Sequence, residues 1–254
     1  MKIILFVWLF LLGAVMGSFV CCQTWRLRYR ELKKKDLGKR SVCLNCGYKL
    51  KWYDNLPIVS WLMLRGKCRK CREKIGVAEI VAEAGMGLVF LLYGMTTSDE
   101  WWMMILMLLM ICILGFLAIY DGKWGELPTK QLIMAIVVGL VISVVKITTC
   151  KAEIWSVLAG IGILAGIYYI LYIASREKLV GGGDWMLGLA IALAVSDWWL
   201  ALWVMFLANM IGTIVAMPDI IKRKKKKIYF GPYLVVAFVI VIVFAKGLTG
   251  LIGF

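Results

Sequence analysis

Eight apolar runs, most of them close to 20 residues long, constrain this chain more than any other feature. Bounded by charged and turn residues, they fall near 3–22, 77–95, 101–120, 131–145, 154–173, 185–195, 198–217 and 231–251, and the sixth is short. About 20 apolar residues in a helix span the hydrocarbon core of a bilayer. With 63% hydrophobic residues and a mean hydropathy of +0.87, the chain is too apolar for an ordinary soluble protein. The sequence therefore predicts an all-α polytopic membrane protein with about eight transmembrane helices.

The first apolar run is expected to remain in the protein as a membrane span. It has no small-residue cleavage site, and a strongly basic stretch follows it. The chain then divides into a first transmembrane helix at 1–22, a polar loop at 23–76 and a transmembrane core of about seven helices at 77–254.

The distribution of lysine and arginine predicts the orientation in the membrane. With the N-terminus outside, the inner segments 23–76, 121–130, 174–184 and 218–230 carry 16, 2, 2 and 6 of the 30 basic residues. Tryptophans then cluster at the outer helix ends, namely Trp101, Trp102, Trp155, Trp198 and Trp199. The net charge of +15 indicates a cytosolic face held near an anionic inner leaflet, with the run 222–227 as part of it, and requires no nucleic acid.

Two C-x2-C pairs stand in the cytosolic loop: "CLNC" at 43–46 and "CRKC" at 68–71, separated by 21 residues. This spacing is typical of a structural zinc site with four thiolate ligands, here Cys43, Cys46, Cys68 and Cys71. Nearby basic residues favour the thiolate form. Two disulfides are the alternative, which a reducing cytosol disfavours. The other cysteines are expected to pack as small apolar residues; they are Cys21, Cys22, Cys112 and Cys150.

General acid–base chemistry must come from carboxylates or thiols, because the chain has no histidine. Acids inside a membrane cost about 2.5–3.5 kcal/mol, so those that border spans usually face a protein interior or a wet cavity. Glu79, Glu83, Asp121 and Asp184 are such acids. Asp121 closes the third span in "LAIYDGKWGELP" and Asp184 opens the sixth in "VGGGDWMLG", both at the predicted inner edge. Facing each other, they would suit aspartyl protease chemistry, with one carboxylate ionised as the base for a water and the other protonated as the acid.

Three glycines precede the second aspartate. Without side chains, Gly181, Gly182 and Gly183 would allow an extended peptide to lie along their backbone while Asp184 points at the scissile bond. The alternative is a plain helix-entry turn in which Asp184 is an N-terminal cap.

Together these motifs resemble the type IV prepilin peptidases, a family of intramembrane aspartyl proteases named for the G-x-G-D motif, over most of the chain. "GSFVCCQTWR" at 17–26 is similar to the family's opening motif, with Cys21 in place of asparagine. The loop at 43–71 follows the family's zinc-loop pattern, and Glu83 falls on its second-helix glutamate. "DGKWGELP", "GGGD" and "FGPYL" at 230–234 match further signatures.

The resemblance implies a membrane-embedded aspartic endopeptidase of the bacterial cytoplasmic membrane. Asp121 and Asp184 would be catalytic, and Gly181, Gly182, Gly183 and Glu83 would bind substrate. The alternative for Glu83 is an interior acid that is hydrogen-bonded near the loop. The enzyme would cleave prepilins or pseudopilins after the glycine that ends their basic leader, at the cytosolic membrane edge. It also implies N-methylation of the new N-terminus as a second activity, which would require S-adenosylmethionine.

Two departures from the family pattern motivate alternative functions. Met186 replaces a lysine and Thr129 replaces an acidic or amide residue. One alternative is a degenerate or methyltransferase-only member. The other is a non-enzymatic scaffold whose zinc loop docks partners for pilus assembly or secretion.

Overall fold

The computed structural model describes residues 2–33, 41–43, 45–97, 99–149, 151–175, 181–221 and 229–250. Within these ranges the chain is helical apart from loops and two isolated β-bridges, and six helices are long and apolar enough to cross a membrane. Two shorter apolar helices, Gly182–Val195 and Gly231–Ala245, correspond to the sixth and eighth predicted runs. The predicted all-α membrane fold is thus confirmed. Two predictions lie outside the described residues: those for the basic run 222–227 and for Cys150.

Two compact units divide the chain, Met1–Met95 and Thr96–Phe254. The first contains α1 (Lys2–Lys33), the short η1 (Trp52–Asn55) and α2 (Val59–Met63), and α3 (Val77–Thr96). The second contains α4 (Trp101–Trp124), α5 (Thr129–Thr148), α6 (Ile154–Ile161), η2 (Gly162–Gly166), α7 (Ile167–Ser175), α8 (Gly182–Val195), α9 (Trp198–Ile221) and α10 (Gly231–Gly250). The predicted division at residues 22 and 76 stays a prediction.

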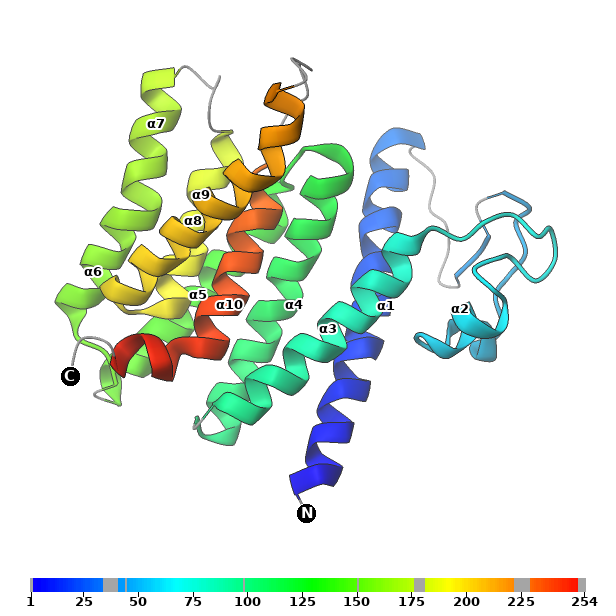
Figure 1. The fold of residues 1–254 in the computed structure, drawn as a ribbon, viewed down its shortest axis with the longest axis horizontal. Coiled ribbons are helices and arrows are strands. Elements are labelled where there is room, and N and C mark those ends of the chain that lie inside the picture. Colours follow the sequence, from blue (N-terminus) through cyan, green and yellow to red (C-terminus); the bar gives the residue numbers. More distant parts are fainter. Residues whose placement is uncertain are drawn as a thin grey trace. The chain divides into compact units, whose positions relative to one another are not determined.

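Glycines bring α1 and α3 together in the first unit, where the two helices cross (Figure 1). A Cβ built on Gly13 would lie 2.6 Å from the carbonyl oxygen of Met86, and one on Gly17 would overlap the carbonyl oxygen of Ala82. Small residues four apart allow two membrane helices to approach at their backbones. The contact therefore depends on the absence of side chains at these positions.

Helix α8 forms the centre of the second unit. It contacts α5, α6, η2, α7, α9 and α10, and its residues from Leu187 to Val195 are buried except for Leu189, which is half-buried. An apolar helix covered on all sides belongs to a core. Its 14 residues are too few to span a membrane alone, which explains the short sixth run.

Polar contacts fix the C-terminal end of α8. At its C-terminal end, Lys146 of α5 donates hydrogen bonds to the carbonyl oxygens of Ala194 (2.9 Å) and Val195 (3.0 Å). These carbonyls have no partner within the helix, and a cation suits the negative end of the helix dipole. The N-terminal end, where Asp184 lies, is thereby held at a defined position in the unit.

Candidate active site and metal centre

Asp121 lies one turn before the end of α4 and is buried, with 6% of its surface exposed. The backbone N–H of Gly231, the first residue of α10, donates a hydrogen bond of 3.0 Å to its Oδ2. A Cβ on Gly231 would lie only 2.7 Å from that oxygen. The glycine therefore permits a close approach that fixes the carboxylate against a helix N-terminus, where negative charge is favoured.

Asp184 is the third residue of α8 and is also buried. Its Oδ2 accepts a hydrogen bond of 2.9 Å from the backbone N–H of Gly181, and its own N–H donates to the carbonyl oxygen of Gly181 at 3.1 Å. This is the carboxylate half of a capping box. The chain thus makes a helix-entry turn, but with Gly181 at the N-cap and Asp184 two residues beyond the helix start, and the second carboxylate is in the same kind of setting as the first.

Contacts between the two motifs bring them to one end of the second unit. A Cβ on Gly183 would lie 2.8 Å from the side chain of Leu127, six residues after Asp121. The Phe230 ring, next to Gly231, packs edge to face on Tyr168 with 5.4 Å between centroids. Tyr168 in turn lies against Gly188, one turn after Asp184. The two aspartates therefore share one region, while their predicted catalytic roles stay predictions.

The three predicted substrate-binding glycines have distinct surroundings. The Gly181 N–H donates to the Asp184 carboxylate, a Cβ on Gly182 would be in ordinary contact with the ring of Tyr172 at 3.5 Å, and Gly183 lies against Leu127. Gly181 and Gly182 are exposed. Their backbone is thus reachable next to a buried carboxylate, and peptide binding there remains a prediction.

The four predicted ligand cysteines form a cluster that could bind a metal ion. The sulfur atoms of Cys43, Cys46, Cys68 and Cys71 all lie within 4.8 Å of one another, and those of Cys43 and Cys71 are 3.8 Å apart. Zn–S bonds of about 2.3 Å would place the sulfurs of a tetrahedral site about 3.8 Å apart. All cysteines among the described residues are free thiols, so the disulfide alternative is not supported there.

The two C-x2-C pairs fold as repeated turns. In the first, the N–H of Gly47 donates to the carbonyl oxygen of Cys43, and in the second the N–H of Arg72 donates to that of Cys68. Gly47 and Arg72 both adopt positive φ, at 68° and 61°. A β-bridge closes each turn, Val42 with Lys49 and Lys67 with Lys74. Each turn directs its two sulfurs to the same point.

The thiols of the cluster differ in acidity. A hydrogen bond from the backbone of Cys71 lowers the pKa of Cys68 to about 7. A hydrogen bond from the backbone of Tyr48 lowers the pKa of Cys46, but desolvation and the three neighbouring sulfurs together raise it to about 11. Adjacent thiolates repel one another. A bound cation would therefore favour ionisation of all four thiols.

Asp54 ties the two turns together. It is buried, and it accepts hydrogen bonds from Arg69 Nε (2.7 Å), the Lys51 N–H (3.1 Å) and the Tyr48 hydroxyl (3.3 Å). Burial would raise the pKa of Asp54, but the bonds from Arg69 and Lys51 lower it. Arg69 also lies over the ring of Tyr53, 5.0 Å from its centroid. The carboxylate thus links the two cysteine turns.

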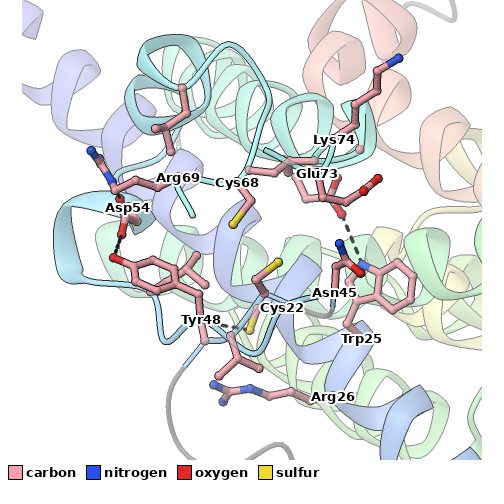
Figure 2. Close-up of a pocket in the computed structure, with 18 residues that line it drawn as sticks. Cys22, Trp25, Arg26, Asn45, Tyr48, Asp54, Cys68, Arg69, Glu73 and Lys74 are labelled. Carbon is pink, nitrogen blue, oxygen red and sulfur yellow. Dashed lines mark hydrogen bonds and ion pairs between the residues drawn. The ribbon is translucent and has the colours of Figure 1, made fainter. Parts of the chain in front are cut away.

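A cavity of about 370 Å³ lies beside the cysteine cluster within the first unit (Figure 2). The end of α1 contributes Cys22, Trp25 and Arg26, and the Trp25 indole N–H donates to Glu79 Oε1 at 3.3 Å. The loop contributes Asp54, Cys68, Arg69, Glu73 and Lys74, among others. Of the cysteines predicted to pack as small apolar residues, Cys21 and Cys112 are buried, whereas Cys22 is half-buried and lines this cavity.

Glu83, predicted to bind substrate, is buried in α3 and accepts a hydrogen bond of 2.7 Å from the N–H of Ile58. Its observed partner is therefore the backbone of the loop. A role in substrate binding stays a prediction.

Sequence reasoning gave no role to Gly231, although it recognised the "FGPYL" stretch that contains it. It also missed Tyr168 and Asn209, whose amide donates to the Tyr168 hydroxyl at 3.1 Å. A glycine followed by proline directly before an apolar run is a local signal for a constrained helix start. Nothing in the sequence pairs that start with Asp121, 110 residues away.

The fold defines a multi-pass helical membrane protein with a four-thiol module in its first unit. Residues 11–97 match the model of the bacterial Peptidase A24 N-terminal domain. Over these residues the chain is similar to the Peptidase A24 family.

Curated relatives of this chain carry consistent names. A "Prepilin leader peptidase/N-methyltransferase" from Vibrio cholerae is 29% identical over 73% of this chain and 76% of its own length. One of the same name from Aeromonas hydrophila is 25% identical over 94% of this chain and 91% of its own length. A "Type 4 prepilin-like proteins leader peptide-processing enzyme" from Escherichia coli is 27% identical over 87% of each chain. No solved structure matches the chain significantly.

Proposed function

We propose that this protein is an aspartic endopeptidase that removes the leader peptide from prepilins or pseudopilins. The observation that carries the proposal is the pair of buried aspartates at one end of the second unit, each hydrogen-bonded to a glycine N–H at a helix start. The names of the relatives support the substrate class. Cleavage of a purified prepilin by the purified protein tests it.

In the proposed reaction, Asp121 and Asp184 divide the roles of base and acid. The ionised carboxylate takes a proton from a water whose oxygen attacks the scissile carbonyl carbon, while the protonated one donates to the carbonyl oxygen. Collapse of the tetrahedral intermediate breaks the C–N bond, and the leaving amine takes a proton from a carboxylic acid. The backbone donors at Gly231 and Gly181 hold both carboxylates in place throughout.

The substrate's shape fits a site at the membrane edge. With the N-terminus outside, the basic leader stays in the cytosol, the apolar segment enters the bilayer, and the bond between them meets the aspartates. A helical substrate hides its carbonyls in hydrogen bonds, so the segment must be locally extended. The glycine before the bond and the exposed backbone at Gly181 and Gly182 favour that conformation.

We also propose that the ion held by the four cysteines is zinc in a structural role. Four thiolates at tetrahedral spacing suit zinc, and such a site stabilises a loop too small to have its own core.

Cys43→Ser should release the metal and loosen the loop, because one of four ligands is lost. Zinc binding stabilises small modules by about 10–16 kcal/mol, so limited proteolysis within 41–76 should become much faster. Metal content by mass spectrometry and the cleavage pattern measure both effects. Cys22→Ser is the matched control, since Cys22 lines the adjacent cavity but is not in the cluster. Full zinc content in Cys43→Ser would contradict the assignment.

The second activity in the relatives' names gives the cavity beside the cluster a candidate ligand. S-adenosylmethionine carries a sulfonium, an ammonium, a carboxylate and an aromatic base. The cavity offers Glu73 and Glu79 for the cationic groups, Arg26 and Lys74 for the carboxylate, and Trp25 for the base. Its volume of about 370 Å³ falls within the range of small-molecule sites, about 300–1,000 Å³.

Trp25→Ala should weaken S-adenosylmethionine binding about threefold to tenfold, the loss expected for one aromatic stacking contact. Equilibrium dialysis with labelled ligand measures it, and Asp121→Asn protein keeps proteolysis out of the assay. Trp52→Ala, an exposed tryptophan outside the cavity, should bind like the unchanged protein. If both variants bind S-adenosylmethionine equally well, this cavity is not its binding site. The peptidase proposal would not be affected.

A further inference from the structure

A stripe of exposed apolar side chains runs along the loop segment 56–63. Val59, Leu62 and Met63 of α2 follow helical spacing and are 50%, 59% and 78% exposed, and Leu56 just before the helix is also exposed. Residues at i, i+3 and i+4 share one face of a helix. In the otherwise polar loop, α2 thus presents an apolar face that the described residues do not cover.

Trp61 fixes the segment to the metal module. A Cβ on Gly66 would lie 2.8 Å from the Trp61 ring, so the ring packs directly on the backbone that leads into the second cysteine pair. The apolar face at Val59, Leu62 and Met63 is therefore a defined surface of a folded module.

The contact with Glu83 indicates where this segment lies along α3. Ile58, which precedes α2, donates its N–H to Glu83 Oε2 at 2.7 Å. Glu83 lies six residues into α3, a candidate membrane span that starts at Val77. At 1.5 Å per residue, the contact is about 9 Å along the helix. The start of α2 therefore contacts α3 within the candidate span, beyond its first turn.

Non-helical backbone at that depth needs internal hydrogen-bond partners, because hydrocarbon offers none. Ile58 has a positive φ of 63°, so its N–H is turned out of any regular helix. The buried Glu83 carboxylate accepts that N–H. This hydrogen bond to irregular backbone explains why an acid lies inside a candidate span.

Basic residues on the same loop indicate which kind of surface the apolar stripe contacts. Lys51, Arg65, Lys67, Lys70 and Arg72 are exposed on the same loop. An apolar face on a loop rich in exposed basic residues is the pattern of segments that insert into an anionic leaflet.

We propose that the segment 56–63 is an interfacial anchor that inserts its apolar face into the lipid leaflet on the loop's side. Glu83 of α3 is the receptor of this anchor, in the sense that it accepts the hydrogen bond from the Ile58 N–H. The anchor holds the metal module against the membrane. This holds whatever reaction the protein catalyses, since it depends on the fold of the first unit alone.

A photoreactive diazirine amino acid at Met63 tests the anchor in the full-length protein. In vesicles of phosphatidylethanolamine and phosphatidylglycerol, irradiation should add phospholipid mass to the protein. The yield should match that at Leu88, an exposed position in α3, and far exceed that at Lys49, an exposed position on the first cysteine turn. A yield at the Lys49 level, or adducts at Met63 with protein in place of lipid, would overturn the proposal.

Glu83 variants test the receptor with the same probe. Glu83→Leu removes the acceptor and should abolish most lipid adduct at position 63, whereas Glu83→Gln keeps a carbonyl oxygen for Ile58 and should retain it. Adduct at Leu88 in the Glu83→Leu protein shows that α3 is still inserted. If Glu83→Leu leaves the yield at position 63 unchanged, Glu83 is not the receptor.

Discussion

Asp121→Asn and Asp184→Asn should each reduce cleavage of a purified prepilin by about 10³-fold or more, while the unchanged protein cleaves after the leader glycine. Asparagine keeps the size of the side chain and a carbonyl oxygen that can still accept from Gly231 or Gly181. What it loses is the carboxylate that takes and returns a proton. Initial rates in liposomes, with the product junction identified by mass spectrometry, measure the effect.

Asp197→Asn is the matched control for both variants. Asp197 also accepts a hydrogen bond at a helix start, from the N–H of Leu200 at 2.9 Å, but it precedes α9 rather than α8. The Asp197→Asn variant should cleave prepilin at the same rate as the unchanged protein. A protein inert in its unchanged form would favour the degenerate or methyltransferase-only alternative, as Met186 and Thr129 suggested. Cleavage activity in Asp121→Asn or in Asp184→Asn would show that these carboxylates serve the fold.

The scaffold alternative makes a separate prediction for the same variants in cells. A protein that only docks assembly partners through its metal loop should support pilus assembly equally well with both aspartates replaced. Loss of assembly in Asp121→Asn cells, with the variant present at normal level in the membrane, would exclude it.

The sequence predicted those features that depend on residues close together in the chain. Apolar runs gave the helices, and the C-x2-C spacing gave the cysteine cluster, because both are local patterns. The deep burial of α8 was not predictable, since it depends on contacts with α5, α6, η2, α7, α9 and α10 that no single run encodes. A hydrogen bond between Glu83 and the loop was considered from the sequence, but the donor, the N–H of Ile58, could not be named from it.

The same limit explains why Gly231 escaped notice while Asp121 did not. An aspartate at the end of an apolar run is conspicuous, whereas the glycine that holds it stands at the start of another helix, 110 residues later. Its importance rests on a hydrogen bond and on a distance, neither of which leaves a spacing pattern.

Gly231→Ala should lower kcat for prepilin cleavage about 100-fold with little change in KM. The added Cβ would lie 2.7 Å from Asp121 Oδ2, so the carboxylate must move away from the Gly231 N–H. Misplacement of a catalytic group by about 1 Å costs on the order of 10²-fold. Steady-state kinetics with purified prepilin measure the two constants separately.

Gly122→Ala provides the matched control, because it adds the same methyl group next to Asp121 from the other side of the contact. Its Cβ would meet Pro232 Cγ at 3.5 Å, an ordinary contact distance. Alanine is the better helix former by about 0.5–1 kcal/mol, so helix propensity alone would favour both variants. Near-normal kcat in Gly122→Ala with a large loss in Gly231→Ala would therefore locate the defect at the Asp121 carboxylate. Equal kinetics in the two variants would show that the hydrogen bond from Gly231 does not position the catalytic group.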